Sequence, residues 1–135
     1  MYIKQFTKEI VIFMLTLIMA SGAYMLFEQY TYHDTSNPQA ALKRAAQTHS
    51  VTTLIFHKTG CPDCKSVVTA INRGIKDNPN SNYVVVDTKH SKLYQHYNVE
   101  TVPTIIRLVD GHEVSRYSGT SKREIANILT DNVTR

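Results

Sequence analysis

The chain of 135 residues contains two cysteines, Cys61 and Cys64, with two residues between them. The apolar, β-branched run 51–56 precedes the pair and predicts a buried strand, and apolar residues at helical spacing follow Pro62. A thiol at a helix N-terminus ionises more easily, because unpaired backbone N–H groups and the helix dipole favour negative charge there. The thiolate is the form that attacks disulfides, so this placement predicts thiol–disulfide exchange.

The two cysteines are expected to have different roles. Cys61 would attack a substrate, and Cys64, about one helical turn later, would resolve the mixed disulfide. Cys64 should lie deeper and be less accessible. A disulfide that closes so short a loop restricts the unfolded chain little, so the pair is predicted to serve chemistry and not stabilisation.

Two other interpretations of the cysteines remain open. A tetrahedral zinc site needs four ligands, and here His57 could be a third but no fourth is evident. We therefore expect no metal. The remaining alternative is that both cysteines are inert.

Residues close to the pair in sequence are candidates for tuning the ionisation of the Cys61 thiol. The negative charge of Asp63 disfavours ionisation of Cys61, whereas the positive charges of the basic side chains nearby favour it. The signs conflict, so no reduction potential is predicted. The candidate tuning residues are His57, Lys58, Pro62, Asp63 and Lys65.

The rest of the sequence after residue 38 alternates between helix and strand signals. Asn37 and Pro38 predict the start of a helix, and Ser121 with Glu124 predicts a capping box at the start of the last one. Asp110–Gly111 predicts a hairpin turn. The order predicts an α/β fold with a mixed sheet covered on both faces. The expected elements are a helix over 38–47, a strand over 51–56, a helix over 62–76, a strand over 83–88, a helical turn over 91–99, strands within 101–111 and 113–119, and a helix from 121.

These features together resemble the thioredoxin superfamily. The residues that carry the resemblance are the run 60–64 (GCPDC), the run 102–104 (VPT) and the run 117–119 (YSG). The resemblance covers residues 39–135 and implies a three-layer fold with Pro103 in the cis form facing the cysteines. It also implies that the backbone of Val102 pairs with substrate, that Pro103 keeps the loop from ligating metal, and that no bound cofactor is needed.

Two positions depart from the family pattern. Thioredoxins carry a tryptophan before the first cysteine, where this chain has Gly60, and the chain contains no tryptophan. They also carry a buried acid on the strand below the cysteines, where this chain has Ile55. Without that acid, Cys64 should act more slowly unless another group substitutes.

The N-terminal region differs in composition from the rest. Residues 10–27 are eighteen residues without a charge, preceded by Lys4 and Lys8. A membrane span needs about 20 apolar residues, with about 17 as a lower limit, so residues 1–30 are expected to be an anchor. The alternatives are a signal peptide cleaved near Ser21–Ala23, or a buried soluble helix. Lys4 and Lys8 should stay in the cytoplasm, which predicts an extracytoplasmic domain.

The predicted organisation is therefore an anchor (1–30), a linker (31–38) and a thioredoxin-like domain (39–135). From residue 39 on there are thirteen Lys and Arg against eight Asp and Glu, scattered without a run, and nucleic-acid binding is not expected. The expected function is a single-pass, monomeric protein thiol–disulfide oxidoreductase of the cell membrane, with a recycling redox partner. The rivals are a reductant for one client, a non-catalytic accessory component of a secretion, conjugation or peptide-export system, and a metal-binding module.

Overall fold

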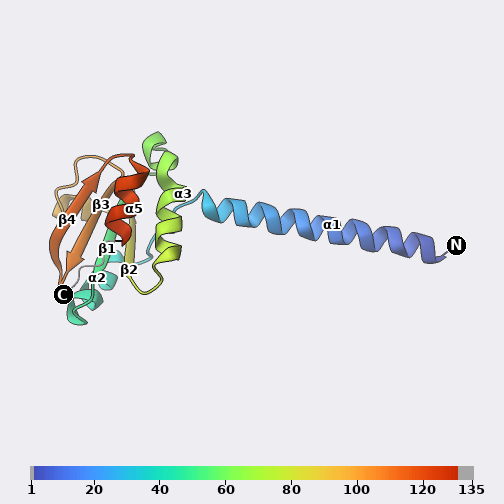
Figure 1. Ribbon diagram of the computed structural model, residues 1–135, viewed down its shortest axis with the longest axis horizontal. Helices are drawn as coiled ribbons and strands as arrows, with labels where there is room; N and C mark the ends of the chain where they lie inside the picture. Colours follow the sequence, from blue (N-terminus) through green and yellow to red (C-terminus); the bar gives the residue numbers. More distant parts are fainter. Residues whose placement is uncertain (1, 131–135) are drawn as a thin grey trace. The chain divides into compact units, whose positions relative to one another are not determined.

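The computed structural model describes residues 2–130, and the chain divides into two compact units, Met1–Tyr30 and Thr31–Arg135. The first unit consists of helix α1 (Tyr2–Gln29), none of whose residues is buried within the protein (Figure 1). By length and composition α1 is able to cross a membrane, and a signal sequence meets the same criteria.

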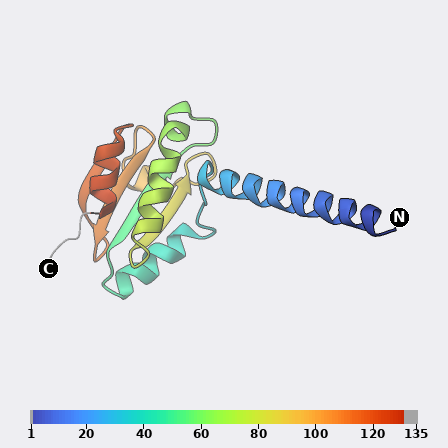
Figure 2. The ribbon, with the colours of Figure 1, turned by 45° about the vertical axis from the view of Figure 1, so that its right-hand side comes forward.

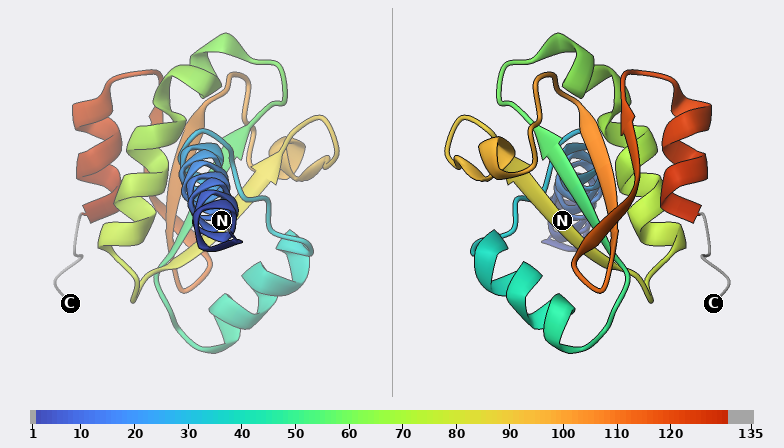
Figure 3. Two further views of the ribbon diagram at one scale, coloured as in Figure 1. Left: turned by 90° about the vertical axis from the view of Figure 1, so that its right-hand side faces the viewer. Right: turned by 90° about the vertical axis from the view of Figure 1, so that its left-hand side faces the viewer.

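The second unit is a four-stranded sheet with helices on both faces. Its strands lie in the order β2–β1–β3–β4, with β1 parallel to β2 and antiparallel to β3, and β3 antiparallel to β4. Helices α3 and α5 cover one face, and α2 lies on the other (Figures 2 and 3). This is the expected three-layer α/β architecture. The elements are α2 (Pro38–Gln47), β1 (Thr52–His57), α3 (Pro62–Asp77), β2 (Asn82–Asp87), α4 (Leu93–His96), β3 (Thr104–Val109), β4 (His112–Ser118) and α5 (Lys122–Thr130).

Strand β1 is central, and all six of its residues are buried. Side chains alternate between the faces of a strand, so Ile55 packs with Val67 and Ile71 of α3, whereas Leu54 and Phe56 join the cluster on the opposite face. A strand buried on both faces needs a continuous apolar run, which explains why the sequence here shows no polar alternation.

The N-terminal cap predicted for α2 is confirmed, whereas the capping box predicted for α5 is only half formed. The Asn37 side chain accepts from the backbone N–H of Ala40, as expected for the cap of α2. At α5 the N–H of Glu124 donates to the Ser121 hydroxyl, 3.4 Å away. The N–H of Ser121, however, donates to the Tyr117 hydroxyl (2.8 Å) in place of the Glu124 carboxylate that a capping box would supply.

The segment 31–37, expected to be a linker, makes hydrogen bonds with the second unit. The N–H of Thr35 donates to the Val85 carbonyl (2.9 Å), and the N–H of Val85 donates to the Thr35 hydroxyl (3.0 Å). The Asn72 amide of α3 donates to the Thr31 carbonyl (2.8 Å). These contacts place the segment in the compact unit, against β2 and α3.

Replacing Ile71 by alanine should strongly destabilise the second unit, because Ile71 is 0% exposed and lies in the cluster between α3 and the sheet. We expect the free energy of unfolding to fall by about 2–5 kcal/mol. The control is Val114→Ala on β4, where the side chain is 52% exposed and the loss should stay below about 1 kcal/mol. Urea unfolding of the full chain in detergent, followed by tyrosine near-ultraviolet circular dichroism, measures both. Equal losses at the two positions would contradict the assignment of the core.

Candidate active site

Cys61 and Cys64 form a disulfide at the N-terminus of α3. Their Cα atoms are 5.3 Å apart, within the usual range for a disulfide. Cys61 is the N-cap of the helix, and its Sγ accepts from the backbone N–H of Cys64 at 3.1 Å. Cys61 is half-buried and Cys64 is 1% exposed, so the predicted difference in access is confirmed.

The loop before β3 lies against the first cysteine. The Val102–Pro103 peptide bond is cis, as the resemblance implied. The Val102 carbonyl oxygen is 3.9 Å from the Sγ of Cys61, and the Pro103 carbonyl accepts from the N–H of Gly119. The structure therefore brings together the four residues predicted as cysteine pair and docking loop.

The predicted tuning residues do not form one group. Lys58, Pro62, Asp63 and Lys65 are exposed around the start of α3. His57 is buried at the end of β1, on the same face of the strand as Ile55. Its environment is therefore different in kind from that of the surface charges.

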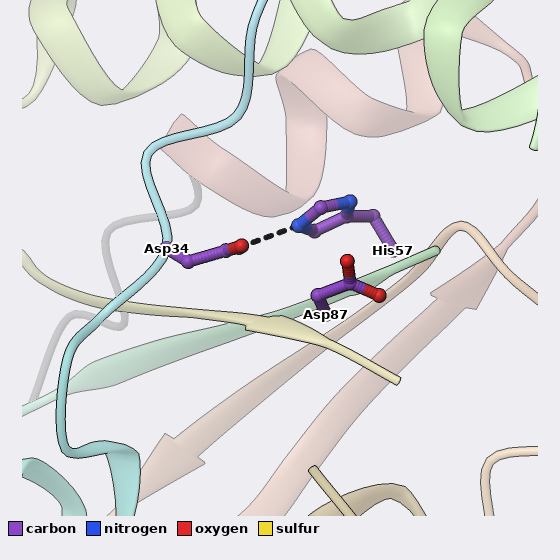
Figure 4. A group of neighbouring side chains, drawn as sticks. All are labelled: Asp34, His57 and Asp87. Carbon is purple, nitrogen blue, oxygen red and sulfur yellow. Dashed lines mark hydrogen bonds and ion pairs between the residues drawn. The ribbon is translucent and has the colours of Figure 1, made fainter. Parts of the chain in front are cut away.

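His57 is held by residues from two other stretches of the chain (Figure 4). Its Nε2 and the Oδ1 of Asp34 are 2.5 Å apart, and Asp87 of β2 lies close by. The side chain of His57 is 5% exposed and that of Asp34 is 46% exposed. The ring of Tyr32 stacks on the imidazole, with centroids 4.0 Å apart and planes 13° from parallel.

Asp87 connects this group to the loop that leads to Cys61. Its carboxylate accepts from the hydroxyl of Thr59 (2.5 Å), from the N–H of Thr59 (3.3 Å) and from the N–H of Lys89 (2.8 Å). Burial by itself would raise the pKa of Asp87. The hydrogen bonds from Thr59 and Lys89, with the nearby His57, outweigh that effect and hold the pKa of Asp87 below its ordinary value.

Tyr32 connects the same group to the second cysteine. Its hydroxyl donates to the Cys64 carbonyl oxygen at 2.7 Å. Burial raises the pKa of Tyr32 above its ordinary value, so the hydroxyl remains a neutral donor at physiological pH.

Sequence reasoning missed Tyr32, Asp34, Thr59 and Asp87. Asp87 could have been found, because it ends the strand parallel to β1 and pairs in register with His57. Tyr32 and Asp34 lie in a short polar segment that shows no periodicity, and nothing in their spacing pointed to the cysteines.

Asp34, His57 and Asp87 each offer one atom of the kind that binds metals, and these atoms lie within 4.8 Å of one another. The carboxylate of Asp87 already accepts three hydrogen bonds, and the Nε2 of His57 is engaged by Asp34. Hydrogen bonds within the protein therefore account for the arrangement without an ion.

A family model described as a thioredoxin-like domain matches residues 38–134. The chain belongs to this family. Among curated proteins, it is 28% identical over 103 residues to thioredoxin-2 of Pyricularia oryzae, covering 76% of this chain and 60% of that protein. It is 24% identical over 102 residues to an H-type thioredoxin of Oryza sativa subsp. indica, covering 75% of this chain and 84% of that one. The chain thus spans less than two thirds of the fungal relative.

Solved structures agree with the family assignment. Thioredoxin NaTrxh of Nicotiana alata matches with a TM-score of 0.66 and 25% identity, over 74% of this chain and 88% of that one. Fasciola hepatica thioredoxin matches with a TM-score of 0.62 and 22% identity, over 69% and 92% of the two chains, and supports the fold. The predicted thioredoxin-like fold is confirmed.

Replacing Asp87 by asparagine should remove a pH-dependent part of the stability. Because the pKa of Asp87 is lowered on folding, its contribution is complete above the ordinary carboxyl pKa of about 4 and is lost as pH falls through the lower folded value. At pH 7 we expect a loss of about 1–3 kcal/mol for Asp87→Asn, and the gap to the wild type should shrink in acid. Urea unfolding at neutral and acid pH measures it, with the exposed Asp77→Asn as control. A gap that is constant with pH would refute this assignment.

Proposed function

We propose that this protein is a thiol–disulfide oxidoreductase that exchanges disulfides with protein thiols through Cys61 and Cys64. The observation that carries the proposal is a disulfide at the N-terminus of α3, with its half-buried sulfur facing the loop of the cis Val102–Pro103 bond. Membership of the thioredoxin-like family supports the same chemistry.

In the reduced protein, Cys61 is the attacking thiolate. The N–H of Cys64 points at its sulfur, and together with the dipole of the 16-residue helix α3 it stabilises negative charge there. Attack on a substrate disulfide releases one substrate thiolate and leaves a mixed disulfide on Cys61. Cys64 then loses its proton and attacks the sulfur of Cys61, which releases the second thiolate. Two electrons pass to the substrate, and a second dithiol must return them, so no bound cofactor is required.

Val102 is suited to docking of an extended substrate segment. It precedes β3 without belonging to it, and its carbonyl lies beside the Sγ of Cys61. A substrate strand paired with this backbone would bring its own sulfur to Cys61, with specificity coming from side chains at alternate positions.

Helix α1 would keep this chemistry at a membrane. Its apolar stretch is long enough to span a bilayer, and Lys4 and Lys8 favour a cytoplasmic N-terminus. The proposed protein is a single-pass monomer whose redox domain is extracytoplasmic and whose clients are exported or membrane-adjacent proteins. Ile55 and Gly60 depart from thioredoxins at two site positions, which favours a specialised client range over general reduction.

Replacing Cys61 by serine should abolish turnover of a disulfide-bonded protein substrate, because the remaining thiol of Cys64 is 1% exposed and out of reach of a protein disulfide. Replacing Cys64 by serine should leave the first attack intact and trap the substrate on Cys61. Non-reducing gels and intact mass spectrometry of the full chain detect the trapped species. Turnover by Cys61→Ser would refute the enzyme assignment, and full biological function without both cysteines would support the accessory role.

The anchor assignment predicts that the full chain stays with membranes after alkaline extraction and keeps residues 1–30 by intact mass. Leu17→Arg combined with Ile18→Arg should release a large fraction, because each arginine costs about 2.5–3.5 kcal/mol near the centre of a span. Ser36→Arg, which lies outside α1, is the matched control. A mature chain that begins after Ala23 would show instead that the segment is a cleaved signal peptide.

A further inference from the structure

Cys64 needs help to lose its proton in the resolving step. It is 1% exposed, and burial disfavours the charged thiolate. On the sheet face covered by α3, the middle of β1 presents Ile55, which is 0% exposed and cannot accept a proton. The next residue on that face is His57, at the end of the strand.

A continuous series of contacts joins His57 to Cys64 and to solvent. On one side, the imidazole stacks on Tyr32, whose hydroxyl donates to the Cys64 carbonyl in the first turn of α3. On the other side, its Nε2 bonds to Asp34. The exposed fraction rises along this series from 1% at Cys64 to 46% at the side chain of Asp34. The hydrogen-bonded pair of His57 and Asp34 therefore connects the interior to solvent.

Asp34 also determines which nitrogen of His57 is free to react. A carboxylate at Nε2 favours the tautomer that carries its proton there, which leaves Nδ1 as the acceptor. Figure 4 shows this second nitrogen on the side of the ring away from Asp34. An imidazole oriented by a carboxylate is the arrangement that enzymes use for general bases.

We propose that Asp34 and His57, joined to Cys64 through Tyr32, promote the resolving step of the exchange. The inference rests on the proposed function. The S–H bond of Cys64 breaks and its proton passes to Nδ1 of His57, directly or through one water, while the sulfur attacks Cys61 and the bond from Cys61 to the substrate sulfur breaks. The stacked Tyr32 ring holds the imidazole and carries no proton. The pair then releases the proton to solvent at Asp34. Tyr32 and Asp34 are positioning residues in this step, since neither touches a reacting sulfur.

Other charged groups lie around His57. Asp87 faces it from β2, and His90 lies 3.9 Å from the Asp87 carboxylate. From α3, Cys64 is linked to this group through Tyr32. Asp87 is committed to Thr59 and Lys89, whereas Asp34 is bound to His57. Asp34 is therefore the position at which the proposal is tested most cleanly.

The test separates the two steps in time. The reduced full chain in detergent is mixed with dithiobis-nitrobenzoate, a symmetric aromatic disulfide that releases one coloured thiolate when Cys61 attacks and a second when Cys64 resolves. In Asp34→Asn and His57→Gln the second release should slow by about tenfold or more and lose its wild-type pH dependence. The first release should stay within about twofold of wild type, and Asp34→Glu should recover part of the second rate.

The chain supplies a matched control pair. His49 Nδ1 and Asp110 Oδ1 are 3.2 Å apart, with side chains 79% and 50% exposed. His49 follows α2 and Asp110 lies in the turn between β3 and β4, and their side chains bond to one another. His49→Gln and Asp110→Asn remove a histidine–carboxylate pair of the same kind and should leave both releases unchanged.

The outcomes are distinguishable. A second release in Asp34→Asn that matches wild type in rate and pH profile overturns the proposal, and so does equal slowing of both releases, which would indicate a purely structural role. If His57→Gln does not fold by circular dichroism, Asp34→Asn at its half-exposed position decides the question. Failure of the wild type to give a first release would refute the proposed oxidoreductase function, not this inference.

Discussion

The site depends on one constraint, which is that a sulfur at the start of α3 has to carry negative charge while its partner sulfur stays buried. The helix meets the first requirement, because the N–H of Cys64 in its first turn donates to the Cys61 sulfur and the helix dipole acts in the same direction. The second requirement fixes the surroundings. One turn into a helix that lies on the sheet, Cys64 has almost no access to water, so its chemistry depends on the side chains between α3 and β1.

The parallel pairing of β1 with β2 brings the polar part of the site together. Because parallel strands end at the same edge of a sheet, His57 and Asp87 meet where the chain leaves the core, and the loop to Cys61 begins there. The Asp87 carboxylate then holds Thr59, two residues before Cys61. The loop is therefore held by one buried carboxylate together with a turn bond from the N–H of Cys61 to the Lys58 carbonyl.

Much of the fold was predictable from short patterns. The cis bond before Pro103 was implied by the family resemblance and is confirmed. The apolar runs that became β1 and β2, the Asn37 cap and the hairpin at Asp110–Gly111 were indicated by short patterns and are also confirmed. Local chemistry is sufficient in these cases, because a cap, a turn or a buried strand is specified by residues near one another in sequence. Cys61 and Cys64 were predictable for the same reason.

The features that the sequence did not predict depend on contacts between residues far apart in the chain. Whether the N–H of Ser121 donates to Glu124 or to Tyr117 depends on the path of the chain between β4 and α5, and the sequence motif is the same in both cases. Tyr32 and Asp34 reach residues 32 and 23 positions further along the chain. A polar segment without periodicity carries no sign of such contacts, so its sequence predicts a linker.

The hydrogen bonds of residues 31–35 have a consequence for any fragment of this protein. The match to the thioredoxin-like family model begins at residue 38, so Tyr32 and Asp34 lie outside the residues that it covers. For the same reason, a fragment cut at the edge of the family match would keep both cysteines but lose these two neighbours, and its reactivity would not represent that of the whole chain.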